Sequence, residues 1–139
     1  MYKTIQRNEI LTMLQKKHKH LTATEVYDLL RDKMPQISLG TVYRNLELLA
    51  EKGIISQVKS YSKQKRFEAN TKFHLHTRCP ICDTIEDIEH VEQQIIDALA
   101  KLNSESYILE FINCCPICKE KLEKQKNLSR LKKQPLSLL

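Results

Sequence analysis

The sequence predicts an α+β fold in two small domains: a unit of three helices and two short strands, then an α/β unit with a three-stranded antiparallel sheet. In the first part of the chain, apolar residues recur at the spacing of a helix and residues typical of helix caps stand before them. Short strand-like segments follow, and two CPIC motifs lie at the start and the end of the later part. With 139 residues, 41% of them hydrophobic, and only two glycines and four prolines, the chain can bury a core and is not of low complexity.

The first two helices are predicted from apolar spacing and from their start signals. Positions 5, 10, 11 and 14 are apolar, which suits an amphipathic helix from Thr4, as its N-cap, to about residue 17. In the stretch LTATEVYDLLRDKMP, Thr22 and Glu25 form a capping box, and the following proline ends the helix. Its inner face is expected to hold Val26, Leu29 and Leu30.

A third helix follows after the short turn PQIS, with Ser38 as its expected N-cap and Gly53 as its C-terminal stop. Three helices with a tight connection between the last two predict a helix-turn-helix. Two short strands, 54–59 and 66–68, enclose a basic polar loop that is a candidate wing. We therefore expect a winged helix-turn-helix domain over residues 1–70. The inner face of the third helix should hold Val42, Leu46 and Leu49.

The character of the sequence changes after residue 70, which predicts a hinge at 71–73 and a second domain over 74–139. Strands are expected at 74–79, 84–90 and 106–114. The basic segment 119–134 is expected to form a solvated helix that frays into the tail. A helix is expected at 91–103, with inward positions Val91, Ile95, Ile96, Leu99 and Leu102.

Charge is distributed unevenly along the chain. The net charge is +7 through residue 73, −6 from 74 to 118 and +5 from 119 onward. The N-terminal part therefore has the charge to approach phosphates, although lysine-rich helix faces are often merely solvated. No apolar run has the length of a signal peptide or a membrane span, so we expect a cytoplasmic protein with reduced thiols and no membrane partner.

Four of the five cysteines form the two CPIC motifs, which are separated by 32 residues. Each CxxC turn supplies two sulfur ligands, and two such turns brought together by a strand, a helix and a strand suit structural zinc. The alternative is a thioredoxin-like redox site, but its CPxC motif normally occurs once and in a βαβ setting. Cys114 is expected to be a spare thiol at a strand end. The predicted zinc ligands are Cys79, Cys82, Cys115 and Cys118.

His74 and His76 alternate on a predicted strand, so their side chains should project to the same side. Two surface histidines are at least as common as a metal site, but this pair lies just before a CxxC and near two carboxylates, Glu68 and Asp87. Imidazole with carboxylate suits Fe(II), Mn(II) or Zn(II), whereas four thiolates suit structural zinc. The difference in ligand type predicts two separate metal sites.

Taken together, these motifs resemble those of the ferric uptake regulator family. HLTATEVYDLL, ISLGTVYRNLELLAEKGII, KRFE, HLH, CPICDTIED and the closing CPIC occur in that family's order and approximate spacing over about residues 4–118. The resemblance implies a bacterial, homodimeric winged-helix repressor with a C-terminal dimerisation domain. Such a protein is not an enzyme, and it binds double-stranded operator DNA with an AT-rich inverted repeat when a metal corepressor is present.

The resemblance also implies roles for particular residues. His18 is the histidine that competes with His20, and it is interpreted as solvated; His90 is given no role. Contacts with bases and phosphates would come from Ser38, Thr41, Tyr43 and Arg44. The regulatory metal, Fe²⁺ or Mn²⁺ with Zn²⁺ as a substitute, would be bound by His20, Glu68, His74, His76 and Asp87. Because two of these ligands come from the DNA-binding part or hinge, one ion would hold both domains in the arrangement that binds DNA.

Two features depart from the family pattern. Members usually have an additional helix before the segment that matches TIQR, and we expect the DNA contacts of that helix to be missing or replaced. In typical peroxide-responsive members the position of Glu68 is Asp, so Glu68 favours metal sensing over the alternative of peroxide sensing through histidine oxidation. An alternative outside the family is a zinc-stabilised interaction module that does not bind DNA.

Overall fold

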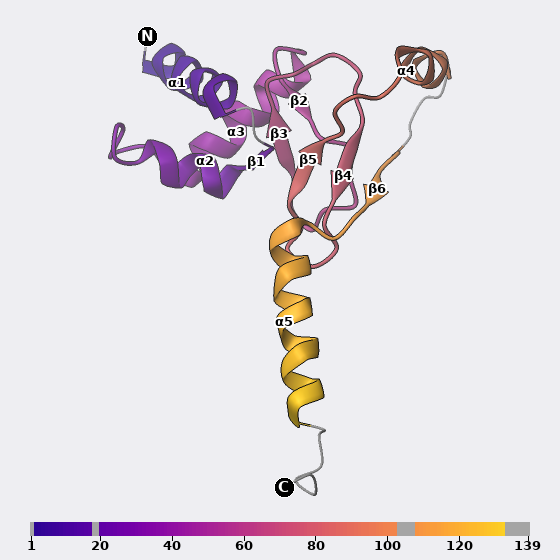
Figure 1. Cartoon of the computed structure of the whole chain (residues 1–139). Helices are drawn as coiled ribbons and strands as arrows, with labels where there is room; N and C mark the ends of the chain where they lie inside the picture. The colour runs from indigo at the N-terminus through magenta and orange to yellow at the C-terminus, as the bar shows by residue number, and fades with distance from the viewer. Residues whose placement is uncertain (1, 18–19, 103–107, 133–139) are drawn as a thin grey trace, which may run out of the picture.

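The computed structural model describes residues 2–17, 20–102 and 108–132, which form a mixed α and β fold (Figure 1). We call the part from α1 to β3 the N-terminal unit and the described residues from His74 onward, which include β4 to α5, the C-terminal unit. The elements follow in the order α1 (Tyr2–Lys17), β1 (Leu21–Thr22), α2 (Ala23–Leu30), α3 (Leu39–Glu51), β2 (Ser56–Gln57), β3 (Arg66–Glu68), β4 (His76–Arg78), β5 (Ile85–Asp87), α4 (Gln93–Ala100), β6 (Phe111–Ile112) and α5 (Pro116–Lys132).

The N-terminal unit packs three helices and an antiparallel sheet of order β1-β3-β2 around one core. Ile10 of α1, Val26 of α2, Val42 and Leu46 of α3 and Phe67 of β3 are all fully buried in this core. Burial of apolar side chains of this size stabilises the folded state by about 1.5–3 kcal/mol each. The same packing therefore fixes both the orientation of α3 and the position of the residues that end β3.

The start signals predicted for α2 and α3 are confirmed. Thr22 Oγ1 accepts a hydrogen bond from Glu25 N at 3.2 Å, and Glu25 Oε2 accepts one from Thr22 N at 2.9 Å, which completes the capping box. Ser38 Oγ accepts from Thr41 N at 3.1 Å. After α3, Gly53 has a φ of +73°, a left-handed conformation that glycine adopts without a steric cost. Local chemistry thus sets the ends of both helices.

Three predictions for the N-terminal unit are corrected. Helix α1 begins at Tyr2, so Thr4 lies inside the helix and is not its N-cap. Leu29 is 43% exposed, because the face of α2 that reaches the core runs through Val26 and Leu30. The first predicted strand is reduced to β2, and β1 is a strand that the pattern of apolar residues did not indicate.

The C-terminal sheet has the order β5-β4-β6. Strand β4 pairs antiparallel with β5, which places His76 opposite Asp87, but it pairs parallel with β6, which places Thr77 opposite Phe111. The prediction of a wholly antiparallel sheet is therefore wrong. After β5 the chain passes through α4 to the other side of β4, where β6 runs in the same direction as β4. Part of the third predicted strand, residues 106–107, lies outside the described residues.

The last two helices stand away from the sheets in Figure 1. None of the residues of α4 is buried, and Ile95 is 48% exposed, so the prediction that its apolar face points inward is wrong within a single chain. Asn103, its predicted end, lies outside the described residues. Helix α5 is almost wholly exposed, as predicted for the basic segment. Among the described residues, no helix combines the length and the apolar character needed to cross a bilayer.

Candidate metal sites

Five side chains from both units converge in one place, which we call the five-residue cluster. His20 immediately precedes β1, and Glu68 ends β3, whereas His74 lies two residues before β4, His76 begins β4 and Asp87 ends β5. One ligand atom from each residue lies within 4.8 Å of those of all the others. The structure thus brings together all five residues proposed for the regulatory metal, although His74 lies before the strand and not on it.

Glu68 is the buried centre of this cluster. Its carboxylate oxygens lie 2.8 Å from His20 Nε2, 3.0 Å from His74 Nε2 and 3.3 Å from His76 Nε2. The side chain of Glu68 is 7% exposed, whereas that of Asp87 is 44% exposed, so solvent reaches the cluster from β5. Asp87 Oδ1 contacts the same three nitrogens at 2.9, 3.2 and 3.3 Å. Three imidazole nitrogens and two carboxylates directed at one point form a suitable ligand set for a divalent transition metal.

Burial and charge act in opposite directions in the five-residue cluster. Burial alone would lower the pKa of His20, but the hydrogen bonds and charges of Glu68 and Asp87 outweigh it and raise that pKa. The hydrogen bond with Glu68 raises the pKa of His74 to about 9. Burial alone would raise the pKa of Glu68, but its histidine neighbours hold it far below its usual range. The cluster therefore attracts positive charge, and a bound metal would displace protons from the imidazoles.

The raised pKa of His74 predicts how stability depends on pH in protein that contains zinc but no regulatory metal. Because the folded value of about 9 lies above the ordinary value of 6.5, protonated His74 stabilises the fold fully below pH 6.5, and this contribution is lost as the pH rises through 9. The free energy of unfolding should therefore fall over this window. Urea unfolding at a series of pH values measures it. His74→Gln, which cannot be protonated, should flatten the slope, and an unchanged slope would contradict the assignment to His74.

The second cluster contains four thiols. Cys79 and Cys82 come from the β4–β5 turn, Cys115 immediately precedes α5 and Cys118 lies in its first turn, and one sulfur from each lies within 4.8 Å of the others. Cys82 Sγ lies 3.7 Å from Cys115 Sγ. All five cysteines are free thiols, and Cys114 is a half-buried residue outside the four-thiol cluster. The four predicted zinc ligands are thus brought together, and Cys114 is not among them.

The thiols of this cluster do not ionise alike. Backbone hydrogen bonds from Cys115 and Cys82 lower the pKa of Cys79 to about 6, whereas the hydrogen bond with Cys115, followed by burial, raises the pKa of Cys118 to about 12. Four thiolates at these separations repel one another, so complete ionisation requires a cation. Tetrahedral zinc suits four thiolates. A thioredoxin-like site uses one CxxC pair, whereas here the two motifs meet in a single cluster.

The four residues predicted to contact DNA lie at the exposed start of α3. Ser38 Oγ and Thr41 Oγ1 are 2.9 Å apart, and Arg44 Nη2 donates to Thr41 Oγ1 at 3.3 Å. Tyr43 is 37% exposed, and Lys65 Nζ from the β2–β3 loop lies 5.6 Å from its ring centroid. Sequence reasoning missed Lys65, because nothing local to the basic loop indicates that it folds back onto α3. The predicted inner residues Val42, Leu46 and Leu49 are buried.

Of the two remaining histidines, only His90 lies within the part of the chain that the structure describes, and it belongs to neither cluster. His18 lies outside the residues that the structure describes. The side chain of His90 is 94% exposed, and its contact is with Glu89 at 3.8 Å. His90 is therefore suited to serve as a control position.

This chain is similar to known proteins of one family. The model of the ferric uptake regulator family matches residues 1–112. The peroxide-responsive repressor PerR of Staphylococcus epidermidis is 32% identical over 121 residues, which cover 84% of this chain and 81% of that protein. The ferric uptake regulator of Francisella tularensis, solved with iron, has a TM-score of 0.66 at 28% identity and covers 82% of this chain and 91% of its own. The Campylobacter jejuni peroxide stress regulator has a TM-score of 0.67 at 26% identity, and the match covers 83% of this chain and 90% of that protein. The family match over most of the chain, with the clusters described above, identifies this protein as a member of the ferric uptake regulator family.

Proposed function

We propose that this protein is a metal-dependent transcriptional repressor that binds operator DNA as a homodimer when a regulatory metal is present. Residues 1–70 would act as a winged helix-turn-helix DNA-binding domain, 71–73 as a hinge, and 74–139 as a dimerisation and metal-binding domain with a basic tail. The observation that carries the proposal is the five-residue cluster, because its ligands come from both units. Members of this family are regulators, and we assign the chain no catalytic role.

The five-residue cluster is proposed as the regulatory site, with Fe²⁺ or Mn²⁺ as the native ion and Zn²⁺ as a substitute. Mixed imidazole and carboxylate ligands suit all three ions. Iron is present in the Francisella tularensis relative, which supports Fe²⁺ here. The four-thiol cluster is proposed as the structural zinc site, because four thiolates suit zinc.

The proposed DNA surface is the exposed start of α3 with the β2–β3 loop as the wing. Arg44 and Tyr43 would contact bases or backbone, and Ser38 and Thr41 would lie near phosphates. The wing adds Lys63 and Lys65, and Lys65 also forms an ion pair with Glu47 of α3 at 2.8 Å. This contact joins the wing to the recognition helix, so the two would meet DNA as one surface. An AT-rich inverted repeat is the expected operator.

A homodimer is supported by apolar surface that one chain leaves uncovered. On α4 and just after it, Ile95 and Leu102 are 48% and 65% exposed, and on the edge strand β6, Phe111 and Ile112 are 48% and 61% exposed. Side chains of this kind normally lie inside a protein or an interface. A second copy of the same chain would cover them and place two α3 helices for successive half-sites.

The proposed mechanism follows from which units supply the ligands. His20 and Glu68 would approach the ion from the N-terminal unit, while His74, His76 and Asp87 would approach from the other unit. A bound ion supplies the positive charge that holds both carboxylates and all three imidazoles at one point. The closed arrangement would then be favoured, and DNA bound to it would in turn tighten metal binding.

The function is tested by operator binding of zinc-loaded dimeric protein under anaerobic conditions. We expect Fe(II) or Mn(II) to raise the affinity for an AT-rich inverted repeat by about 10- to 100-fold, the usual range of such coupling, and a chelator to reverse it. Fluorescence anisotropy measures the affinity, and a scrambled duplex is the control. Equal binding with and without the metal, or no binding to any inverted repeat, would contradict the proposal.

Peroxide sensing is the second candidate, because the Staphylococcus epidermidis relative is a peroxide-responsive repressor. We favour metal sensing because Glu68 stands where typical peroxide-responsive members carry Asp. The same iron-loaded sample, treated with peroxide, separates the two functions. Retained operator binding and unmodified histidines are expected. Release of DNA together with one added oxygen on His20 or His74, found by mass spectrometry, would instead establish peroxide sensing.

A further inference from the structure

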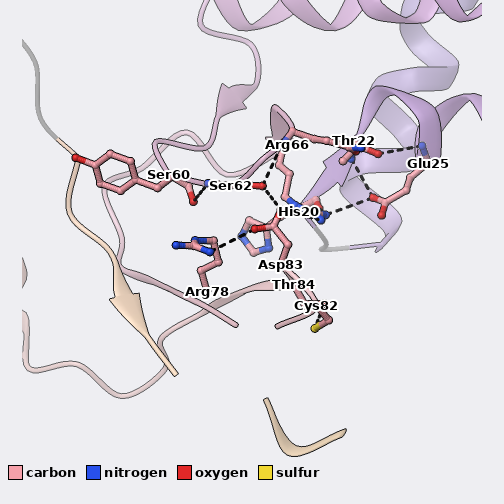
Figure 2. A network of polar contacts seen from close by, with 12 residues as sticks. His20, Thr22, Glu25, Ser60, Ser62, Arg66, Arg78, Cys82, Asp83 and Thr84 are labelled. Carbon is pink, nitrogen blue, oxygen red and sulfur yellow. Dashed lines mark hydrogen bonds and ion pairs between the residues drawn. The ribbon is translucent and has the colours of Figure 1, made fainter. Parts of the chain in front are cut away.

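A polar cluster apart from the five metal ligands also joins the two units (Figure 2). We call it the loop clamp, and it comprises Ser60, Ser62, Arg66, Arg78, Asp83 and Glu110. Ser60 Oγ donates to Glu110 Oε2 at 2.6 Å, and Ser62 Oγ donates to Asp83 Oδ2 at 2.5 Å. Between these serines, the backbone N–H of Tyr61 also donates to Glu110 Oε2 at 3.2 Å. Three consecutive residues of the β2–β3 loop are thus held by two carboxylates of the C-terminal unit.

Two arginines complete the loop clamp and balance its charge. Arg78 donates from Nε and Nη2 to Glu110 Oε1 at 3.0 and 2.9 Å, and its Nη1 lies 3.4 Å from Asp83. Arg66 Nη2 lies 3.9 Å from Asp83 on the other side. The side chain of Glu110 is 6% exposed and that of Asp83 is 20% exposed. Ion pairs shielded to this degree are screened less by solvent than pairs on the open surface.

The loop clamp connects the turn that bears two zinc ligands with the backbone of a regulatory ligand. Asp83 directly follows Cys82, and its φ of +65° is held by a hydrogen bond from its N–H to Cys79 O at 2.9 Å. At the other end, Arg66 Nη1 donates to His20 O at 3.0 Å. Figure 2 shows Arg66, His20 and Asp83 close to one another. His20 and the β2–β3 loop, both in the N-terminal unit, are therefore held by contacts that include no metal ligand side chain.

We propose that Asp83 is a positioning residue that, through Ser62 and Arg66, holds the β2–β3 loop and His20 in place for the regulatory metal. The five ligands then lie near one another before the ion binds, and the apparent metal affinity rises with the fraction of protein in this closed arrangement. This inference rests on the metal site proposed above at the five-residue cluster, and its consequence for operator binding rests in addition on the proposed repressor function.

Two variants remove the same contact from opposite sides. Asp83→Asn removes the charge but retains a side chain that tolerates a positive φ, and Ser62→Ala removes the hydroxyl from the loop. We expect each to weaken Mn(II) binding roughly tenfold, since each variant weakens or removes a hydrogen bond to a charged carboxylate, which is stronger than a hydrogen bond between neutral groups. Each should still bind one Mn(II) at the five-residue cluster and keep its zinc. Amide hydrogen exchange at 60–62 should become faster in both.

Two matched variants should behave like the parent protein. Ser62→Thr retains the hydroxyl, and Glu120→Gln removes a carboxylate whose ion pair with Lys124 is exposed on α5. If Asp83→Asn loses its zinc, the result for Ser62→Ala decides whether the contact affects Mn(II) binding, because Ser62 lies in the unit that supplies none of the four thiols. Mn(II) affinity and amide exchange of Ser62→Ala within twofold of the parent would overturn the proposal. If the parent protein binds no operator but the two variants still bind Mn(II) more weakly than the parent does, the positioning role of Asp83 stands and only the repressor function is refuted.

Discussion

A Cys79→Ser variant is expected to lose its zinc and, with it, the fold of the C-terminal unit. Among the described residues of that unit, the buried apolar side chains are Leu75, Cys79, Ile85 and Cys118, and two of these four are proposed zinc ligands. So small a core cannot stabilise a domain by itself. Structural zinc binds with an apparent free energy on the order of 10 kcal/mol, which exceeds what the two remaining side chains contribute.

Zinc content per chain and hydrogen exchange of the two units measure this outcome. The N-terminal unit should remain protected, because its core contains residues of α1, α2, α3 and β3 and none from the C-terminal unit. Cys114→Ser is the matched control, since Cys114 lies next to the cluster but is not a member, and it should keep one zinc per chain. A Cys79→Ser protein that retained full zinc and parental protection would show that the four thiols are not the zinc site.

A His74→Ala variant should lose metal-dependent operator binding while it keeps its zinc and its dimeric state. His74 Nε2 contacts both Glu68, at 3.0 Å, and Asp87, at 3.2 Å, so its removal takes one ligand from the centre of the cluster. Loss of residues that merely support a ligand costs 10- to 100-fold in metal affinity, so loss of the ligand itself should cost more than about 100-fold. Mn(II) titration by calorimetry and operator binding by anisotropy provide the two measurements.

His90→Asn is the control for this variant, because the His90 side chain is 94% exposed and belongs to neither cluster, and asparagine tolerates the φ of +60° at this position. It should bind Mn(II) and operator DNA as the parent does. If His74→Ala lost zinc as well, the two clusters would not be independent sites, and the assignment of one ion to regulation and the other to structure would be refuted.

Sequence patterns predicted the parts of this protein that depend on neighbours along the chain. Thr22 and Glu25 are three residues apart, and Ser38 caps a helix that begins at the next residue, so their hydrogen bonds follow from local geometry. The two CPIC turns predicted a four-thiol cluster because each turn carries half of it. His20 is different: its approach to Asp87, 67 residues later, was expected from the family resemblance and not from spacing.

Features that depend on distant pairing could not be predicted in this way. The parallel pairing of β4 with β6 depends on the end of the sheet at which the chain re-enters after α4, and no residue of β6 indicates that end. The apolar face of α4 was expected to be buried within its own chain, and it is not. Periodicity shows that such a face needs to be covered, but it does not show which chain covers it. Asp83 and Glu110 resemble ordinary solvated carboxylates in the sequence, and only the folded chain brings the β2–β3 loop to them.

Strand β4 has a further consequence, because it connects the two metal clusters. His76 begins the strand and Cys79 directly follows its end, with only Thr77 and Arg78 between them. An extended chain advances about 3.3 Å per residue, so the Cα atoms of these two ligands are about 10 Å apart along a backbone paired on both sides. The spacing between one residue of each cluster is therefore set by a count of residues along the strand. His76 and Cys79 are three residues apart and therefore point to opposite faces of an extended strand. One inserted residue within 77–78 would bring them to the same face, so substitutions there are tolerable where a change of length is not.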